Sequence, residues 1–261
     1  MSNNKINALI GEEYIKNLFS IFKNQNTELR LVGGSVRDVL MNREASDIDS
    51  ATTLEPNDVL ELLKKNNIEY DDFAIRYGSI IAYPNNKKIQ ITSLREDINQ
   101  LGRHTSVLFT KDWKKDSARR DFTFNALYLG EDCKLYDYYN GQQDLQSKVI
   151  KFIGEIEDRI KEDYLRIYRY FRFLGLFDLP QVNNKTQIIV EKYIHESLSV
   201  LTNEVIRQEI LKMFNMPYPL NCFYQSHVKF KWVEILKEHF IKTNYELGLK
   251  KCLNKIDSII N

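Results

Sequence analysis

Two adjacent glycines, Gly33 and Gly34, place the strongest limit on how this chain can fold. They follow a short apolar run at residues 29–32 and precede residues 35–40, which we expect to form a helix with Ser35 as its N-cap. Glycine has no side chain, so the backbone at such a turn can approach a ligand closely. The free N–H groups at the start of the helix suit a phosphate. The sequence therefore predicts a strand, a tight turn and a helix that together bind a phosphate group.

Two aspartates come next in the chain. Asp47 and Asp49 stand two residues apart in a predicted strand at residues 47–51, so their side chains point to one face. Two carboxylates near a phosphate site can hold two Mg²⁺ ions, which clamp an in-line phosphoryl transfer when they lie roughly 3.5–4 Å apart. Magnesium favours a few carboxylates together with phosphate oxygens. A lone glycine pair is usually a turn and a lone Asp-x-Asp is often a solvated strand end, but the two together predict a catalytic site.

The remaining pattern predicts an α+β fold in two parts. Up to about residue 140, short β-like runs mix with turns, and beyond that amphipathic helix continues almost to the end. In the first part we expect helices at residues 12–23 and 56–65 and strands at residues 73–76, 79–83, 88–92, 124–129 and 134–136. In the second part we expect helices at residues 156–176, 186–197, 202–214, 232–243 and 245–260. The first part is then a head with a small mixed β-sheet.

Composition limits the class of protein without naming a function. Hydrophobic residues make up 43% and charged residues 28% of the chain, as in a globular protein. No apolar run approaches the roughly 18 residues that span a membrane, and the N-terminal residues lack the layout of a secretory signal. Three widely spaced cysteines predict reduced thiols in a cytosol-like compartment. A net charge of +1 neither supports nor excludes nucleic-acid binding, because a basic groove can lie on an otherwise acidic protein.

With these motifs and four more, the sequence resembles the class II tRNA nucleotidyltransferases of the polymerase-β-like superfamily. Residues 119–127, Arg-Arg-Asp-Phe-Thr-Phe-Asn-Ala-Leu, resemble the family's second motif, which reads the ribose and the triphosphate. The third motif, at the junction of head and neck, is matched by Asp137, Gly141, Asp144 and Leu145. Residues 162–166 resemble the family's Glu-Asp-x-x-Arg, its amino-acid template, and residues 203–210 are a weaker match to the last motif, a supporting helix.

The resemblance implies a template-independent enzyme that adds CCA to the 3′ end of tRNA from CTP and ATP, with two Mg²⁺ ions at Asp47 and Asp49. It implies a nucleotidyltransferase head at residues 1–140, a helical neck for base recognition at residues 141–200 and a short helical body for tRNA binding at residues 201–261. We expect no membrane association and a location in the cytoplasm or an organelle matrix. The sequence does not settle the oligomeric state.

The first two motifs supply the residues expected to bind the nucleotide and its triphosphate: Gly33, Gly34, Ser35, Arg37, Asp38, Arg119, Asp121 and Asn125. Arg119 and its neighbour Arg120 can neutralise triphosphate charge, because the guanidinium fork matches phosphate oxygens. The alternative for this pair is a solvated surface position. The resemblance assigns Asp121 and Asn125 to the sugar of the nucleotide, which favours ribonucleotides.

Base recognition is expected from Glu162, Asp163 and Arg166. Asp163 and Arg166 are three residues apart, so they share a face if the segment is helical. An aspartate accepts from an exocyclic amine and an arginine donates to a ring nitrogen or carbonyl, so the pair can read C or A without a nucleic-acid template. The alternative is an ordinary helical ion pair. Arg169 and Arg172 extend the basic face of this helix, where they contact triphosphate or RNA backbone, or are simply exposed.

Three segments bear on how complete the activity is. Residues 95–118 resemble the flexible loop of full CCA-adding and A-adding members, which argues against a CC-only enzyme; His104 within it shows no metal partners. Gln90 occupies the place where the superfamily usually carries a third carboxylate, and an amide cannot act as a general base. The region after the last motif is short, and its aromatic and basic side chains either stack on RNA or pack a terminal helix pair: Phe223, Tyr224, His227, Lys229, Lys231 and Trp232.

Other functions therefore stay open. An A-adding enzyme of the same family is one. A poly(A) polymerase is another, although residues 76–81 lack the Gly-Arg-Arg-Phe-like run typical of those enzymes. A third is a catalytically weakened RNA-binding protein, which Gln90 and the short C-terminal region suggest. Retention of Asp47 and Asp49 argues against that last reading.

Overall fold

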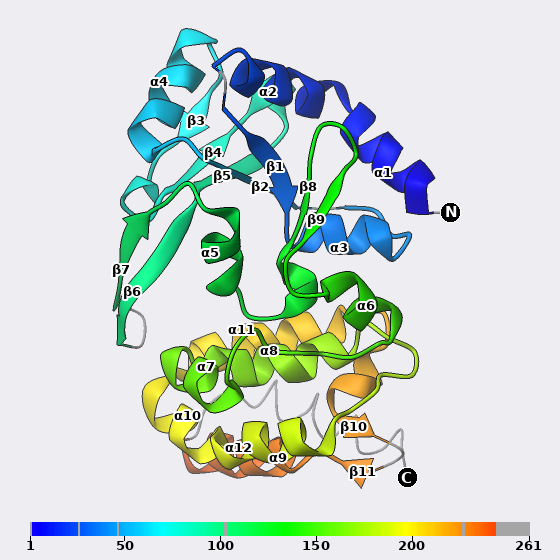
Figure 1. Cartoon of the computed structure of the whole chain (residues 1–261). Coiled ribbons are helices and arrows are strands. Elements are labelled where there is room, and N and C mark those ends of the chain that lie inside the picture. Colours follow the sequence, from blue (N-terminus) through cyan, green and yellow to red (C-terminus); the bar gives the residue numbers. More distant parts are fainter. Residues whose placement is uncertain (1, 26, 46, 102–103, 226–227, 244–261) are drawn as a thin grey trace. The chain divides into compact units, whose positions relative to one another are not determined.

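The computed structural model describes residues 2–25, 27–45, 47–101, 104–225 and 228–243. The chain divides into two compact units, Met1–Asp144 and Leu145–Asn261. The first unit holds the main β-sheet with helices around it, and the second is mostly helical (Figure 1). This is the α+β class that the sequence predicts.

The first unit is built on a seven-stranded sheet in the order β3-β4-β5-β2-β1-β8-β9. Its strands are β1 (Leu29–Val32), β2 (Ile48–Thr52), β3 (Tyr70–Asp71), β4 (Ser79–Ala82), β5 (Ile89–Ser93), β8 (Leu127–Leu129) and β9 (Leu135–Asp137). β2 pairs with β5 in parallel, whereas its pairing with β1 and the other described pairings are antiparallel. The sheet is therefore mixed, with β1 and β2 near its centre.

Four helices share one hydrophobic core with this sheet: α1 (Ser2–Gly11), α2 (Glu13–Lys23), α3 (Gly34–Leu40) and α4 (Pro56–Lys65). α2 buries Ile15, Leu18, Phe19 and Phe22, whose spacing forms one apolar stripe. α4 begins at Pro56, because a proline lacks only an N–H that the first helical turn leaves unbonded anyway. α4 was predicted with the bounds observed, whereas α1 was not predicted.

The described part of the segment 95–118 consists mostly of two strands and a helix. β6 (Arg95–Leu101) and β7 (His104–Phe109) pair as an antiparallel hairpin, and α5 (Trp113–Ala118) follows. Asp112 caps α5, because its carboxylate accepts from the backbone N–H groups of Lys114 and Lys115. The segment identified with a flexible loop thus contains a hairpin attached to a capped helix. The side chain of His104 lies outside the described residues.

Three local predictions in the first unit are wrong in whole or in part. The strand predicted at residues 124–129 begins only at Leu127, because Thr123–Asn125 form a 3₁₀ helix. Ser35 is not the N-cap of α3: the N-cap is Gly33, two residues earlier, and the Ser35 hydroxyl donates to the Val32 carbonyl at 3.3 Å. Residues 73–76 are not a strand. The Asp71 carboxylate accepts from the Phe73 N–H at 2.9 Å, which turns the chain, and a 3₁₀ helix follows at Ile75–Tyr77.

The second unit contains six described α-helices and a short hairpin (Figure 1). The helices are α7 (Ile156–Glu162), α8 (Leu165–Leu174), α9 (Asn184–Lys192), α10 (Ile194–Val200), α11 (Asn203–Phe214) and α12 (Lys231–Lys242); the strands are β10 (Tyr224–Gln225) and β11 (Val228–Lys229). The single helix predicted at residues 156–176 is broken near Asp163, and that at residues 186–197 is broken near Tyr193. The helix predicted at residues 245–260 lies outside the described residues.

Aromatic side chains form the centre of the second unit. The Trp232 ring lies 5.3 Å from the Phe171 ring, 5.6 Å from the Phe223 ring and 6.2 Å from the Tyr168 ring, centroid to centroid. All four are fully buried. Phe223 and Trp232 therefore stabilise the fold and do not offer faces to RNA, which corrects one of the two readings of this segment. His227, from the same segment, lies outside the described residues.

No helix in the described part of the chain is long and apolar enough to cross a membrane.

Candidate active site

The predicted glycine turn lies where β1 ends and α3 begins. Gly33 has φ 76°, in the left-handed region that favours glycine. Its N–H donates to the Leu127 carbonyl at 3.2 Å, and its carbonyl accepts from the Arg37 N–H at 3.0 Å. A Cβ atom on Gly33 would lie 3.7 Å from both Arg120 Nη1 and the Asn125 carbonyl oxygen. The turn is thus lined by residues of the second predicted motif.

The two candidate metal ligands lie beside this turn. Asp49 is in β2, and its partner across the antiparallel pair is Val32, the residue before Gly33. Asp49 is half-buried, whereas Asp47 lies just before β2 and is exposed. Burial raises the pKa of Asp49; the Arg120 guanidinium opposes this rise and the Asp47 carboxylate adds to it. The structure therefore brings both aspartates, the glycine turn and Arg120 to one end of the central strands.

Gln90 neighbours Asp49 on the other side. In the parallel pairing of β2 with β5, Asp49 and Gln90 are direct partners, and Gln90 is half-buried. The predicted placement of a neutral amide on the strand next to the aspartates is therefore confirmed by the strand register.

A hydrogen-bonded chain joins the first motif to the second. Arg37 Nε donates to Asp38 Oδ1 at 2.9 Å, and Arg37 Nη1 donates to Asn125 Oδ1 at 2.9 Å. Asn125 Nδ2 donates in turn to Asp121 Oδ1 at 3.0 Å. Asp121 and Asn125 are buried, so these two side chains have fixed positions next to the glycine turn.

Arg119 and Arg120 both donate hydrogen bonds to one carboxylate, that of Asp116. Arg119 Nε donates to Asp116 Oδ1 at 2.9 Å and Arg120 Nη2 to Asp116 Oδ2 at 3.2 Å. The two arginine side chains are only 16% and 17% exposed. The reading of this pair as a solvated surface feature is therefore wrong. The Tyr128 hydroxyl also accepts from Arg120 Nε at 3.2 Å.

The third motif fixes α6 (Gly141–Gln146) against the second. The Asp137 carboxylate accepts from the N–H groups of Gly141 and Gln142, each at 2.9 Å, and so caps the helix. Thr123 Oγ1 donates to Asp144 Oδ2 at 2.7 Å. A Cβ on Gly141 would lie 2.3 Å from the Thr123 carbonyl oxygen, so only glycine fits there. These residues support the site and are not exposed within it.

The base-recognition candidates lie at the break between α7 and α8 in the second unit. Asp163 ends α7 in an extended conformation, and its carboxylate accepts from the Leu165 N–H at 3.0 Å. The prediction that Asp163 and Arg166 share one helix face is therefore wrong. Arg166 Nη1 donates to Glu162 Oε2 and to the Arg159 carbonyl oxygen, each at 2.6 Å. Glu162 thus fixes the Arg166 guanidinium, while Asp163 is half-buried beside it in the chain.

The two further basic candidates differ in their surroundings. Arg172 pairs with the buried Glu209 of α11 at 3.2 Å and lies over the Phe173 ring, 4.6 Å from its centroid. Arg169 is half-buried, with its guanidinium 5.7 Å from the centroid of the same ring. Arg172 therefore links α8 to α11 and is not the simply exposed residue of one sequence reading.

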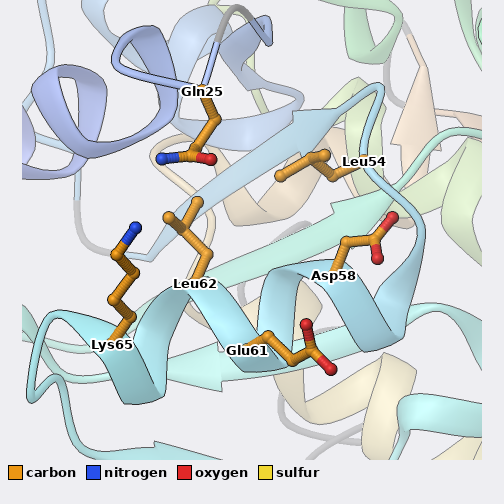
Figure 2. Close-up of a pocket in the computed structure, with 6 residues that line it drawn as sticks. All are labelled: Gln25, Leu54, Asp58, Glu61, Leu62 and Lys65. Carbon is orange, nitrogen blue, oxygen red and sulfur yellow. The ribbon is translucent and has the colours of Figure 1, made fainter.

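A pocket of about 330 Å³ lies elsewhere on the first unit. Figure 2 shows its lining, contributed mainly by α4: Gln25, Leu54, Asp58, Glu61, Leu62 and Lys65. None of the predicted site residues lines it. Asp58, Glu61 and Lys65 are exposed side chains, so we regard it as a surface hollow beside α4.

The residues at the glycine turn fit Mg²⁺ in the way polymerase-like sites require. The described residues contain no group of three or more His, Cys, Asp or Glu that could enclose a metal ion. Asp47 and Asp49 instead offer two carboxylates, one exposed and one half-buried. Magnesium commonly binds one or two carboxylates and completes its coordination with water and substrate phosphates, so this open donor set fits the ion together with a nucleotide.

Sequence reasoning missed Asp116 and Tyr128 as parts of the site. Tyr128 Oη donates to Asp116 Oδ2 at 2.7 Å. Although burial opposes it, the guanidinium groups of Arg120 and Arg119 lower the pKa of Asp116 to about 2. The spacing of Asp116 from the two arginines, three and four residues, was the available signal, because such positions are neighbours on a helix.

Comparisons with known proteins agree with this geometry. Residues 29–151 match the poly(A) polymerase head domain. The chain is 44% identical over 170 residues to human CCA tRNA nucleotidyltransferase 1, mitochondrial, covering 64% of this chain and 39% of the relative. It is 34% identical over 198 residues to a CCA-adding enzyme of Lactobacillus gasseri, covering 75% and 48%. The chain thus spans less than half the length of these curated relatives.

A solved structure shares the fold. The Bacillus stearothermophilus CCA-adding enzyme in complex with CTP superimposes with a TM-score of 0.71 at 25% sequence identity, over 81% of this chain and 51% of that one. The glycine turn, the paired aspartates and the buried second motif all lie within the residues that match the head domain. Residues 29–151 thus form a head domain of the poly(A) polymerase family, and the chain as a whole is similar to CCA-adding enzymes.

Proposed function

We propose that this protein adds CCA to the 3′ end of tRNA, using CTP and ATP and releasing pyrophosphate. One observation carries the proposal: Asp49 lies directly beside the end of β1, so the aspartates, the Gly33 turn and Arg120 meet at one place. Two carboxylates for metal ions, a turn for phosphate and a guanidinium for negative charge are the groups that transfer of a nucleotidyl group to a hydroxyl needs. The printed names of the relatives, CCA tRNA nucleotidyltransferase and CCA-adding enzyme, support tRNA as the acceptor.

Asp47 and Asp49 would hold the Mg²⁺ ions, which when bound supply positive charge to the triphosphate and to the attacking 3′-hydroxyl. Arg120 points its guanidinium toward the glycine turn and adds a fixed positive charge there. Asn125 and Asp121, locked by Arg37, would contact the ribose. Gln90 can orient a hydroxyl but cannot take its proton, because an amide is not a base at neutral pH.

Selection of C and A would come from Glu162, Asp163 and Arg166. Arg166 is 6% exposed and is anchored by Glu162 and by the Arg159 carbonyl. Such anchoring fixes the plane of its guanidinium, which recognition of a base edge requires. Arg169 and Arg172 would add positive charge near the triphosphate or the RNA backbone.

The proposal extends to partners, location and domain limits. tRNA and nucleoside triphosphates are the partners, and the mitochondrial relative supports an organelle matrix or the cytoplasm. The head would occupy residues 1–140, the neck residues 141–200 and the tRNA-binding body residues 201–261.

The deciding experiment supplies a tRNA lacking all three terminal nucleotides, with Mg²⁺ and CTP alone, ATP alone or both. Growth by three nucleotides and no more, only with both, is the expected result. Asp49→Asn, which keeps the shape of the side chain, should abolish it.

One A added only to a tRNA that already ends in CC would make the protein an A-adding enzyme. Long tails with ATP alone would make it a poly(A) polymerase. Tight tRNA binding without incorporation on any substrate would replace the proposal with a weakened RNA-binding protein.

A further inference from the structure

Asp116 is a buried carboxylate of the first unit whose two oxygens accept from four donors. It is 0% exposed. Its Oδ1 accepts from Arg119 Nε at 2.9 Å and from the Arg95 N–H at 3.2 Å. Its Oδ2 accepts from Tyr128 Oη at 2.7 Å and from Arg120 Nη2 at 3.2 Å. A buried carboxylate needs such partners, because burying an unpaired charge is strongly unfavourable.

The four donors come from three different parts of the unit. Arg95 opens β6 and is therefore the base of the β6–β7 hairpin. Tyr128 lies in β8 and is the register partner of Val32, the last residue of β1 before the glycine turn. Arg119 and Arg120 follow α5. Asp116 thus ties together the hairpin, the central sheet and the arginine pair.

Arg120 is the member of this cluster that faces the site. Its Nη1 would lie 3.7 Å from a Cβ on Gly33, and its charge opposes the raised pKa of Asp49. Its Nη2 and Nε are bonded to Asp116 and Tyr128. The Tyr128 ring also lies under the guanidinium, 5.2 Å from centroid to Cζ. Because Nε and Nη2 are hydrogen-bonded, the plane of the Arg120 guanidinium is fixed and Nη1 faces the glycine turn.

We propose that Asp116 is a positioning residue, which aims Arg120 at the triphosphate and couples that aim to the base of the β6–β7 hairpin. This rests on the proposed function, because it takes the glycine turn as the triphosphate site. Asp116 does not touch substrate. Its loss should weaken nucleotide binding more than it slows the transfer step, because a misaimed arginine contributes less to the bound triphosphate.

The test compares Asp116→Asn with Asp112→Asn. Both remove one carboxylate from the same short segment, but Asp112 is exposed and bonds only the backbone N–H groups of Lys114 and Lys115. Asp116→Asn should raise KM for CTP and for ATP about tenfold, with kcat changed less than about threefold and KM for tRNA unchanged. Asp112→Asn should leave all three constants near their wild-type values.

Tyr128→Phe gives a second variant should Asp116→Asn fold poorly. It removes a single hydroxyl that bonds both Asp116 and Arg120, and it should raise nucleotide KM by a smaller factor in the same direction. Hydrogen exchange at the Arg95 N–H should be faster in Asp116→Asn than in wild type, because that N–H loses its charged acceptor.

Direct binding of CTP to each variant separates this proposal from the activity. If wild-type protein binds CTP but adds nothing to tRNA, weaker binding by Asp116→Asn still supports the positioning role. Equal nucleotide KM or equal CTP binding in Asp116→Asn and Asp112→Asn would overturn it. Absence of CTP and ATP binding by wild-type protein would overturn both this inference and the proposed function.

Discussion

Gln90 is the residue whose chemistry departs most from what a polymerase-like site uses. It is the strand partner of Asp49 and is half-buried, so a carboxylate at this position would lie next to the two aspartates. Gln90 thus occupies a position beside the aspartates without adding a negative charge there. Gln90 itself cannot accept a proton, because an amide is not a base at neutral pH.

We expect Gln90→Glu to raise kcat for nucleotide addition by about tenfold, because a glutamate can accept the hydroxyl proton or ligate a metal ion. Gln90→Asn, which keeps the amide, is the control and should not accelerate the reaction. The rates are measured at saturating Mg²⁺, since an added carboxylate beside Asp49 also raises the repulsion that the ions must offset. A Gln90→Glu enzyme no faster than wild type would show that Gln90 is not at the position of a base.

Asp116 also predicts a pH dependence of stability. Its folded-state pKa of about 2 lies below the ordinary value of 3.8, so its stabilising effect is complete above about pH 5 and is lost as the pH falls toward 2. The loss from this group should be about 1 kcal/mol between pH 5 and pH 3 and about 2 kcal/mol by pH 2. Urea unfolding of wild type and Asp116→Asn, followed by Trp113 fluorescence in a Trp232→Phe background, measures the difference. If the free energy of unfolding fell by the same amount with pH in both proteins, the predicted contribution of Asp116 would be contradicted.

Short elements in the first unit depend on close backbone contact as much as on apolar packing. α6 starts at Gly141, which lies against the Thr123 carbonyl, and Asp137 and Asp144 bond both sides of the contact. The resemblance marked Gly141 as part of the third motif, but the sequence pattern does not show its close contact with the Thr123 carbonyl.

Gly141→Ala should therefore destabilise the first unit by about 2 kcal/mol, because the new methyl group would displace backbone atoms of the second motif. Gly11→Ala is a matched control: nothing lies within 4 Å of its Cβ position, and alanine at this helix end should be neutral or slightly stabilising. Thermal unfolding of both variants measures the contrast. A Gly141→Ala protein as stable as wild type would mean that α6 shifts away without cost.

The long, regular elements were predictable and the breaks were not. Periodicity identified α4 and the ends of α11 closely, because one apolar face repeats along each. The break at Asp163 escaped this reasoning, since its carboxylate accepts from the Leu165 N–H and so ends one helix and starts another without proline or glycine. For Phe223 and Trp232 the sequence left packing and RNA contact both open, because aromatic and basic residues side by side have the same pattern in a core and on an RNA surface; their burial decides for packing.

The candidate site was predictable where the chemistry is local. Gly33, Asp47 and Asp49 follow from spacing along adjacent elements, whereas the contact of Arg37 with Asn125 joins residues 88 positions apart. The spacing of Asp116 from Arg119 and Arg120 was a local signal, but its contacts with Arg95 and Tyr128 join residues 21 and 12 positions apart. No local pattern specifies such contacts.

The two units give the protein a division that can be tested directly. The main core of the first unit draws all its residues from the range between Ile6 and Leu129, so it is complete without the second unit. Eight of its buried members come from α1 and α2, which precede the residues that match the head-domain family: Ile6, Leu9, Ile10, Ile15, Leu18, Phe19, Ile21 and Phe22. The folding unit is therefore larger at its N-terminal end than the matched region.

A fragment of residues 1–146, which keeps α6 whole, should fold cooperatively and bind CTP and ATP with affinities equal within about twofold. It retains the glycine turn, the aspartates and Arg120, but lacks the three residues proposed to select the base.

The fragment of residues 29–146 should not fold, since it loses eight buried side chains, each worth roughly 1.5–3 kcal/mol. Circular dichroism, thermal unfolding and nucleotide titration test both fragments. A marked preference of the longer fragment for one nucleotide would place base selection in the head, and stable folding of the shorter one would show that α1 and α2 are accessory to the core.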